Sequence, residues 1–201
     1  MDEPEGFGSS GMKLTSSNFA AAMGLNPYQT RQKLWRVMTS REERDPMNEF
    51  MQWGVDNEFR AVAAVEAITG LIFSNTGENQ HHYDMVTYGD GGRISKYGTT
   101  PDGNCGSTGL ETKCPQTLKD EPPVMYLPQV QGQCWIAGFD TVVFGQWTEE
   151  ETRVWTIARS DEYIAAMECL LADFVLCLTN DTEPKRRKKP VLPELNITRI
   201  N

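Results

Sequence analysis

Apolar residues in the first third of the chain recur at steps of three and four residues, the spacing of one helix face. The pattern predicts a short helix over residues 15–23, a second over 30–40 and a long third over 46–69. A glycine follows the first and the third segment, where helices often end in a left-handed residue. Asp45 precedes the third segment and Pro46 opens it, which is a common arrangement at a capped helix start.

One glutamate interrupts the apolar stripe of the long helix. The stripe contains Met51, Val55, Val62 and Val65. Glu58 lies on it, three residues after Val55 and four before Val62. Burying a carboxylate is costly unless another group compensates it, so Glu58 is a candidate for a metal site or its support. The alternative is that the apolar face of the helix simply ends there.

After residue 70 the pattern changes to short apolar and β-branched runs between turn residues, as in strands. We expect strands over 71–73, 79–88, 94–100, 139–146 and 152–158. Asp90-Gly91-Gly92 is a hairpin-type turn, and the last two runs predict a second hairpin. Two later segments predict helices, over 124–138 with Pro128 early in it and over 161–178. The order of elements predicts an α/β fold with a mixed sheet.

The ends of the chain differ in composition from its middle. Residues 1–11 are acidic and then rich in Gly and Ser, which predicts disorder. We expect a single domain over 12–180 and a polar, basic tail over 181–201. The tail contains Lys185-Arg186-Arg187-Lys188-Lys189, and a solvated run, a nucleic-acid contact and a localisation patch all remain open for it.

The charge and the cysteine content exclude several classes of protein and of metal site. A net charge of −9 counts against a passive nucleic-acid coat, but not against an enzyme that binds phosphates through metal ions. No apolar run approaches a membrane span and no leader pattern opens the chain, so we expect a cytoplasmic protein without a membrane partner. The five cysteines form no CxxC pair, which favours reduced thiols over zinc. His81 and His82 are adjacent, as in a surface pair.

The clearest chemical signal is a turn-rich loop followed by a short strand that Pro115 stops. On that strand Glu111 and Lys113 share a face, while Thr112 points the other way with its carbonyl toward a ligand. If Asp102 ends the neighbouring strand, two carboxylates, a carbonyl and an ammonium converge. Such oxygen-rich ligation suits Mg²⁺. The alternative is a solvated strand with a surface ion pair.

These residues resemble the PD-(D/E)xK nuclease core, and other segments make the resemblance more specific. The chain as a whole is similar to the lambda-exonuclease/YqaJ family of phage recombination nucleases. The matching segments, in family order, are Thr15-Ser16-Ser17-Asn18-Phe19, Gly24-Leu25-Asn26-Pro27-Tyr28, Trp53-Gly54-Val55-Asp56-Asn57-Glu58, Pro101-Asp102-Gly103, Leu110-Glu111-Thr112-Lys113-Cys114-Pro115 and Tyr126-Leu127-Pro128-Gln129-Val130-Gln131.

The resemblance implies a restriction-endonuclease-like core with a mixed central β-sheet flanked by helices. It also implies an Mg²⁺-dependent 5′→3′ exonuclease that degrades one strand of linear double-stranded DNA from 5′-phosphorylated ends. The products would be 5′-mononucleotides and 3′ overhangs for single-strand annealing. The family further implies two Mg²⁺ ions with Mn²⁺ as a substitute, a homotrimeric ring, a single-strand annealing protein as partner, and a phage or prophage gene expressed in the bacterial cytoplasm.

The resemblance also implies roles by position. Asp102, Glu111 and the Thr112 carbonyl would bind metal, and Lys113 would position or deprotonate the attacking water. Glu58 would steer that water or a second metal. Gln131 would support the site.

Other positions would meet the terminal 5′-phosphate. Ser17 and Thr100 match the positions that do so in the family. The family arginine before the Thr-Ser motif has no counterpart, because Ser10 falls there. Lys13 and Arg31 are the candidate substitutes.

Two more residues are candidates for the site, and two other functions are possible on the same core. Asp90 is a candidate ligand for the second metal, and Gln129 is a candidate DNA contact. One rival is a site-specific endonuclease on the same core. The other is a non-catalytic module that binds DNA ends.

Overall fold

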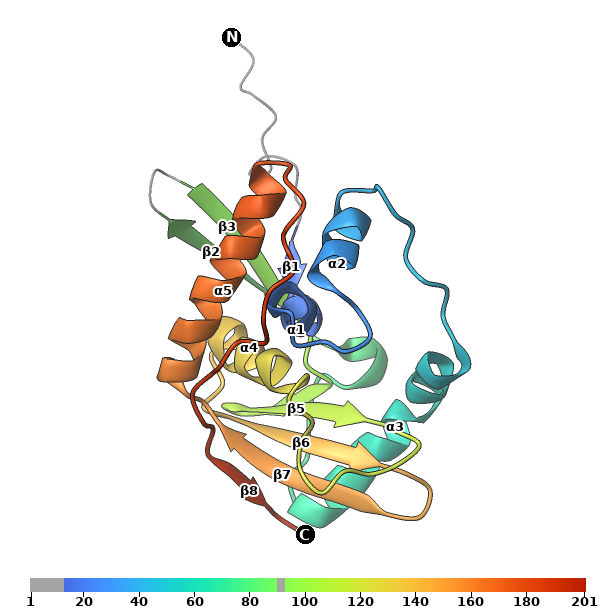
Figure 1. Ribbon diagram of the computed structural model, residues 1–201. Coiled ribbons are helices and arrows are strands. Elements are labelled where there is room, and N and C mark those ends of the chain that lie inside the picture. The colour runs from blue at the N-terminus through green and yellow to red at the C-terminus, as the bar shows by residue number, and fades with distance from the viewer. Residues whose placement is uncertain (1–12, 90–92) are drawn as a thin grey trace.

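The computed structural model describes residues 13–89 and 93–201 (Figure 1). Its first third contains β1 (Leu14–Thr15), the 3-10 turn η1 (Ser16–Asn18), α1 (Phe19–Met23), α2 (Arg31–Met38) and α3 (Glu49–Thr69). The middle contains η2 (Gly77–Asn79), β2 (Tyr83–Gly89), β3 (Arg93–Thr99), β4 (Gly103–Cys105) and β5 (Thr108–Lys113). The last part contains α4 (Leu127–Ala137), β6 (Thr141–Trp147), β7 (Thr152–Ala158), α5 (Asp161–Thr179) and β8 (Ile197–Arg199).

The central sheet has five strands in the order β4-β5-β6-β7-β8. Strands β5 and β6 are parallel and the other neighbours are antiparallel, so the sheet is mixed, as predicted. The parallel pair requires a crossover connection, and α4 provides it. β5 therefore lies inside the sheet, with its carboxyl end beyond the short partner β4.

A second sheet of three strands, in the order β1-β3-β2, lies beside the first. Its parallel β1–β3 pairing places Leu14 opposite Tyr97 and Thr15 opposite Gly98. This register brings the N-terminal residues to the end of β3, immediately before the Asp102 corner. Residues that are distant in sequence therefore meet at the entrance to β4.

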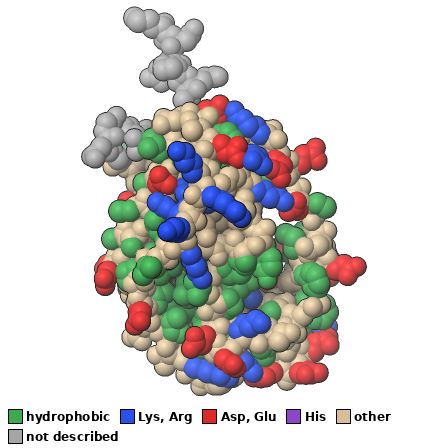
Figure 2. Space-filling view, in the orientation of Figure 1, with side chains coloured by type: hydrophobic (Ala, Val, Ile, Leu, Met, Phe, Trp, Pro, Cys, Tyr) green, Lys and Arg blue, Asp and Glu red, His purple; other side chains and the backbone are tan. Residues whose placement is uncertain are grey.

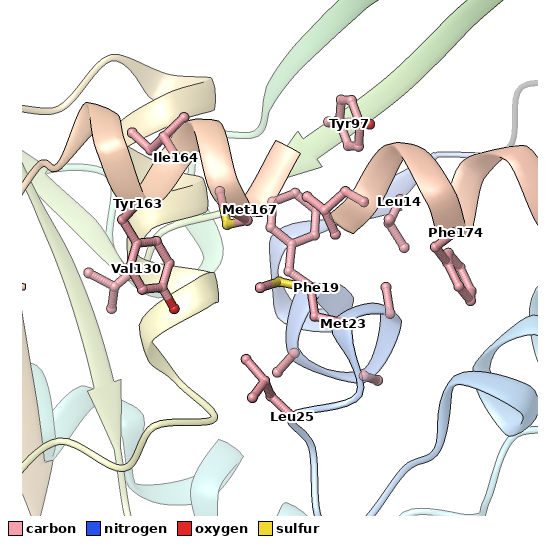
Figure 3. Packing of buried hydrophobic residues seen from close by; sticks show 14 of the residues in the cluster. Leu14, Phe19, Met23, Leu25, Tyr97, Val130, Tyr163, Ile164, Met167 and Phe174 are labelled. Atoms are coloured by element: carbon pink, nitrogen blue, oxygen red, sulfur yellow. The ribbon is translucent and has the colours of Figure 1, made fainter. Parts of the chain in front are cut away.

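Helices cover both faces of the central sheet. Helix α3 packs on β5, β6 and β7 from one side, and α4 packs on β5 and β6 from the other, with α5 behind it (Figure 1). The α3 side is closed by a small cluster that includes Val65, Leu110 and Val143. The main core lies on the α4 side, where side chains from β1, α1, β3, α4 and α5 point toward one another (Figure 3). Phe19 packs edge-on against Tyr97 there, with ring centroids 5.9 Å apart.

The predicted helices are present, but α1, α3 and α4 each begin at least three residues later than predicted; α4, expected from residue 124, begins at Leu127. In the first segment, β1 and η1 occupy residues 14–18, so only Phe19–Met23 is α-helical. Helix α3 begins at Glu49, because the Asn48 side chain caps it by accepting from Met51 N at 2.9 Å. Asp45 instead pairs with Lys33 of α2, with 2.7 Å between Nζ and Oδ1.

The strand predictions are correct for the long runs and wrong for the shortest ones. No strand forms over 71–73; Phe73 N donates instead to the Glu66 carboxylate at 2.8 Å. Residues 103–105, expected as loop, form β4 and pair with β5 around a turn at Gly106, whose φ of 58° suits glycine. β8 was also missed, because the tail is too polar for an apolar pattern and the edge of β7 provides the pairing. The Asp90-Gly91-Gly92 turn lies outside the described residues.

The state of the cysteines and the hydropathy of the helices were also predicted. All five cysteines are free thiols, as expected. Within the described ranges, no helix is both long enough and apolar enough to cross a membrane.

Candidate active site

The alternation of β5 distributes its side chains between the two helical layers. Leu110 joins the cluster under α3, while Glu111 faces α4. Thr112 returns to the α3 side, since its methyl lies near the position a Gly145 Cβ would take, as does Val65. Lys113 again shares the side of Glu111. The strand thus places the side chains of Glu111 and Lys113 on its α4 face and the side chain of Thr112 on its α3 face.

Glu111 is a buried carboxylate surrounded by donors. Its Oε1 accepts from Lys113 Nζ and from Gln129 Nε2 at 2.7 Å, and its Oε2 accepts from Gln133 Nε2 at 2.5 Å. Only 1% of its surface is exposed. Burial, together with the charge of Asp102, raises its pKa to about 7, although Lys113 and Gln133 act in the opposite direction. A surface ion pair does not have this geometry, so that alternative is wrong.

Asp102 reaches β5 from the corner before β4. Its backbone N–H donates to Leu110 O at 2.9 Å, which fixes it beside the strand. Its Oδ2 accepts from both Thr112 N at 2.6 Å and Thr112 Oγ1 at 2.7 Å. The N–H and C=O of one strand residue point to the same edge, so the Thr112 carbonyl faces the Asp102 side.

Glu58 approaches from α3 and is half-buried. Its Oε1 accepts from Gln80 Nε2 at 2.7 Å. Burial raises the pKa of Glu58, the charge of Asp102 raises it further, and the charge of Lys113 lowers it. Glu58 therefore lies within electrostatic reach of the pair on β5. Met51 and Val55 on the apolar stripe are exposed while Val62 and Val65 are buried, so Glu58 lies where the buried part of the stripe begins.

Lys113 is a cation held between carboxylates. Burial by itself would lower its pKa, but the charges of Glu111 and Asp102 outweigh that effect and raise the pKa above its usual value. Its ammonium also lies 5.2 Å from the centroid of the Tyr126 ring. The neighbouring Cys114 thiol has its pKa raised to about 11 by burial and by the nearby carboxylates, so it stays protonated at neutral pH.

The donor set suits a hard cation more than a soft one. Within the described part of the chain, no group of three or more His, Cys, Asp or Glu side chains lies together as a complete metal site. Mg²⁺ does not need one, because it binds through one or two carboxylates and keeps several waters. Asp102, Glu111 and the Thr112 carbonyl supply such a set. The raised pKa of Glu111 also fits a cation, since a divalent ion would compensate the closely spaced carboxylates.

A second polar cluster lies at the other side of the Asp102 corner. The imidazole of His82 contacts Thr100 Oγ1 at 2.7 Å through Nδ1, and through Nε2 it contacts Lys13 Nζ and Asp84 Oδ1, both at 2.8 Å. Lys13 also forms an ion pair with Asp84. Gly98 makes the contact possible, because a Cβ there would lie 2.5 Å from Lys13 Cδ.

Ser17 is exposed close to this cluster. Its neighbour Ser16 bonds to Thr99 Oγ1 at 2.7 Å, which places Ser17 and Thr100 on adjacent segments. Ser17 Oγ itself lies 3.0 Å from Thr15 Oγ1. The helix predicted from residue 15 does not begin there, since Ser17 lies in η1 and the following α1 has only five residues.

Two candidate residues are elsewhere. Arg31 is buried against α5, with its guanidinium 2.7 Å from Asp173 Oδ2 and 5.9 Å from the Phe174 ring centroid. Its buried ion pair therefore gives Arg31 a structural role, whereas Lys13 lies in the polar cluster with His82. Gln131 is also buried, and its amide donates to Ala158 O and accepts from Ser160 N, each at 2.9 Å. It holds the start of α5 and not a site carboxylate, contrary to the prediction.

Sequence reasoning missed Gln133 and His82. Gln133 lies four residues after Gln129, so the two share a helix face, and this spacing was available as a signal. His82 and Asp84 had no such signal, because only the β1–β3–β2 register brings them to Lys13. Asp90, the candidate for a second metal, lies outside the described residues.

Comparisons with known proteins agree with this arrangement. A sequence model of the YqaJ-like viral recombinase domain matches residues 9–140. The fold is similar to the alkaline exonuclease LHK-Exo from Laribacter hongkongensis, with 23% identity, a TM-score of 0.66, and coverage of 84% of this chain and 89% of that one. A structure of LHK-Exo in complex with dAMP has the same identity and TM-score and covers 89% and 94% of the two chains.

A phage-related exonuclease from Haemophilus somnus 129PT is also similar, with 12% identity, a TM-score of 0.58, and coverage of 84% and 92%. No curated protein matches the chain by sequence. These structural matches show that the chain has the same fold as the alkaline exonuclease LHK-Exo. Because the domain model matches well over half of the 201 residues, the chain belongs to the family of YqaJ-like viral recombinase domains.

Proposed function

We propose that this protein is an Mg²⁺-dependent 5′→3′ exonuclease that degrades one strand of linear double-stranded DNA. The observation that carries the proposal is the convergence of Asp102, Glu111 and Lys113 at the carboxyl end of β5. The family membership and the alkaline exonuclease fold support a nuclease. The products would be 5′-mononucleotides and 3′ overhangs for recombination by strand annealing, in the cytoplasm of a bacterial host.

Asp102, Glu111 and the Thr112 carbonyl would hold the metal. When bound, Mg²⁺ would supply a water of lowered pKa and neutralise charge on the scissile phosphate, in a site with one or two ions and with Mn²⁺ as a substitute. The Lys113 ammonium forms an ion pair with Glu111. If a cation shared the charge of Glu111, Lys113 Nζ would be available to hold the attacking water. Glu58, tethered by Gln80, would accept a proton from that water or orient it.

The second polar cluster, at Thr100, Ser17, Lys13 and His82, supports the proposed direction of attack. Thr100 and Ser17 offer hydroxyl donors near the Asp102 corner, and Lys13 and His82 offer nitrogen donors beside them. A terminal phosphate held there would place the first phosphodiester bond over β5, so the enzyme would measure from the 5′ end. His82 with Lys13 would take the place of the family arginine that this chain lacks. Gln129, which donates to Glu111, would lie beside the DNA strand that is cut.

The central experiment compares duplexes that carry a 5′-phosphate on one strand only. With Mg²⁺ we expect the phosphorylated strand to be lost first, and with chelator neither strand. Asp102→Asn and Glu111→Gln should each remove turnover, whereas the exposed Glu194→Gln should not. Resection from 3′ ends, equal loss of both strands, or cleavage of closed circles would refute the exonuclease assignment; the last result would favour the endonuclease. Metal-independent binding of ends without any turnover would favour the non-catalytic module.

The phosphate cluster is tested by the ratio of rates on 5′-phosphorylated and 5′-hydroxyl duplex. Thr100→Ala, Ser17→Ala, Lys13→Met and His82→Gln should each lower this ratio. Two matched controls are His81→Gln, which changes the adjacent exposed histidine, and Ser107→Ala, which removes a hydroxyl at the distant end of β5. A ratio that is unchanged in all four variants would remove the cluster from the mechanism.

We also propose a homotrimeric ring and a single-strand annealing protein as partner. The first half of α3 supports association, because large apolar side chains are exposed along it and just before it: Met47 precedes the helix, and Phe50, Met51, Val55 and Phe59 lie on it. Exposed apolar patches of this kind usually mark contact surfaces. Light scattering after size exclusion should give the mass of a trimer, and a monomer at micromolar concentration would contradict the ring.

A further inference from the structure

A basic segment of the tail has no role in the site described above. Lys185, Arg186, Arg187, Lys188 and Lys189 are all exposed. In Figure 1 the tail descends from the end of α5 across the face that carries α1, and Figure 2 shows Lys and Arg side chains gathered on that face. The chain has a net charge of −9, so a local concentration of cations on it is unusual.

The other cations of the protein are largely committed to carboxylates. Ion pairs involve Lys13, Arg31, Lys33, Arg36, Arg41, Arg60, Lys113, Arg153 and Arg159. Within the basic segment only Arg187 has such a partner, Asp173 at 3.7 Å. The other four residues of the segment form no ion pair with any residue in the described ranges 13–89 and 93–201. The cations that are free to meet an external anion are therefore concentrated here.

Nearby acidic groups do not cancel this charge. Glu183 is held by Arg36 at 2.6 Å, and Asp181 by Arg41 at 2.6 Å. Asp173 accepts from Arg31 at 2.7 Å. These three carboxylates are thus already neutralised by cations from other elements and leave the positive charge of the segment uncompensated.

The segment is also anchored at both ends. Pro184 is buried immediately before it, and Leu192 and Leu195 pack on the main core immediately after it. β8 then pairs with β7. In between, Arg187 Cβ lies 4.0 Å from the position a Gly24 Cβ would take. A solvated mobile run would lose much conformational entropy on binding a polyanion, whereas a backbone held in place loses less.

From this array we propose that Lys185, Arg186, Lys188 and Lys189 bind the phosphate backbone of the duplex behind the cut end. The inference rests on the proposed function for the identity of the polyanion. Such contacts would be independent of base sequence and would retain the substrate between successive cuts. The acidic metal site cannot do this itself, because its carboxylates repel DNA when no cation is bound.

The test measures binding without turnover. A short 5′-hydroxyl duplex is titrated with protein in chelator over a series of salt concentrations. A variant combines Lys185→Gln, Arg186→Gln, Lys188→Gln and Lys189→Gln. A control of equal net charge combines Lys33→Gln, Arg44→Gln, Lys96→Gln and Lys119→Gln, which lie outside the segment.

We expect the slope of log affinity against log salt to shrink by about 2–4 in the tail variant, since each phosphate contact contributes roughly 0.9. At low salt its affinity should fall by about 10- to 100-fold, and the control should resemble wild type. An unchanged slope in the tail variant, or an equal change in both variants, overturns the proposal. A lower mass in light scattering with an unchanged slope would instead assign the segment to a contact between copies. Absence of Mg²⁺-dependent cleavage in the wild type would refute the proposed function without affecting this slope.

Discussion

Glu111 has almost no contact with solvent, and three donors converge on its two oxygens. A buried carboxylate is costly without partners, and removing one partner from such a group costs more than the bond itself is worth. Lys113, Gln129 and Gln133 therefore have a double role: they compensate the burial of the carboxylate and they hold its two oxygens in place. This makes the metal-free site sensitive to pH and the amides of α4 important for metal binding.

The stability of the metal-free protein should depend on pH through Glu111. Its pKa in the folded state, about 7, lies above its ordinary value of 4.5, so between these values the native state binds more protons than the unfolded state. The free energy of unfolding should therefore fall as pH rises from 4.5 to 7, by about 1–3 kcal/mol, and level off above that range. Urea denaturation in chelator measures it. Glu111→Gln should flatten the curve, whereas Glu194→Gln should not; a rise in stability across this range would contradict the assignment.

Gln133 and Gln131 should separate activity from stability. Gln133→Met removes a donor to Glu111 and should weaken metal binding and activity by about 10- to 100-fold, the usual effect of losing a group that orients a metal ligand. Gln131→Met leaves Glu111 intact but removes one bond to the end of β7 and one to the cap of α5, and should lower the free energy of unfolding by about 1–3 kcal/mol. Metal titration by calorimetry and thermal unfolding measure the two effects. The reverse outcome would show that the contacts are misassigned.

Among the elements, α3 and the central sheet must pack closely to bring Glu58 to β5. Gly145 of β6 permits this approach, because a Cβ there would lie 2.5 Å from Val65 Cγ2 and 3.8 Å from Thr112 Cγ2. The same contact thus touches both the helix that carries Glu58 and the strand that carries the ligands. A larger side chain at residue 145 should therefore push α3 away from the site.

Gly145→Ala should therefore lower stability by about 1–3 kcal/mol through overpacking and also reduce turnover. Val65→Ala removes the opposing methyl groups and should cost about 2 kcal/mol by itself. The double variant should be more stable than the sum of the two changes by about 1 kcal/mol, and turnover should recover in part. Chemical denaturation and the nuclease assay measure these effects. Gly54→Ala on α3 faces open space and is the control; it should raise stability, and additive losses in the cycle would refute the contact.

At the scale of the whole molecule, the tail closes the fold as an edge strand. β8 covers the outer edge of β7, and Asn201 extends the cover by accepting from Val154 N at 2.8 Å and donating to Thr152 O at 2.7 Å. β5 lies three strands away from β8 in the sheet order. The cover should therefore matter for stability and solubility more than for chemistry.

Removing residues 196–201 should lower the melting temperature by about 4–8 °C, as expected for a loss near 2 kcal/mol in a chain of this size. The uncovered edge of β7 should also increase aggregation. Nuclease activity per folded molecule should stay close to wild type. Val191→Ser, at a side chain that is 98% exposed, is the control and should change none of these. An unchanged melting temperature, measured by differential scanning calorimetry, would show that β8 adds no stability.

The sequence by itself determined the elements whose signals are local. The periodicity of α3 and α5, the hairpin β6–β7 and the strand that Pro115 ends depend on patterns within a few residues, and the structure has them. The motif from Asp102 to Lys113 also lies in one stretch, so its strand alternation was enough to predict which side chains share a face. For the same reason, the family could be recognised from short segments in order.

Only the tertiary structure decided which distant groups meet. The four-residue spacing from Gln129 places Gln133 on the same helix face, but only the rotation of α4 against β5 turns that face toward Glu111 and turns Gln131 toward the end of β7 and the start of α5. Likewise, strand register brings Lys13 to His82, and a buried contact commits Arg31 to Asp173. β4 and β8 form because neighbouring strands offer unpaired backbone groups, not because their own residues favour strands. Such choices depend on packing and hydrogen bonding between segments far apart in the chain, which local patterns do not record.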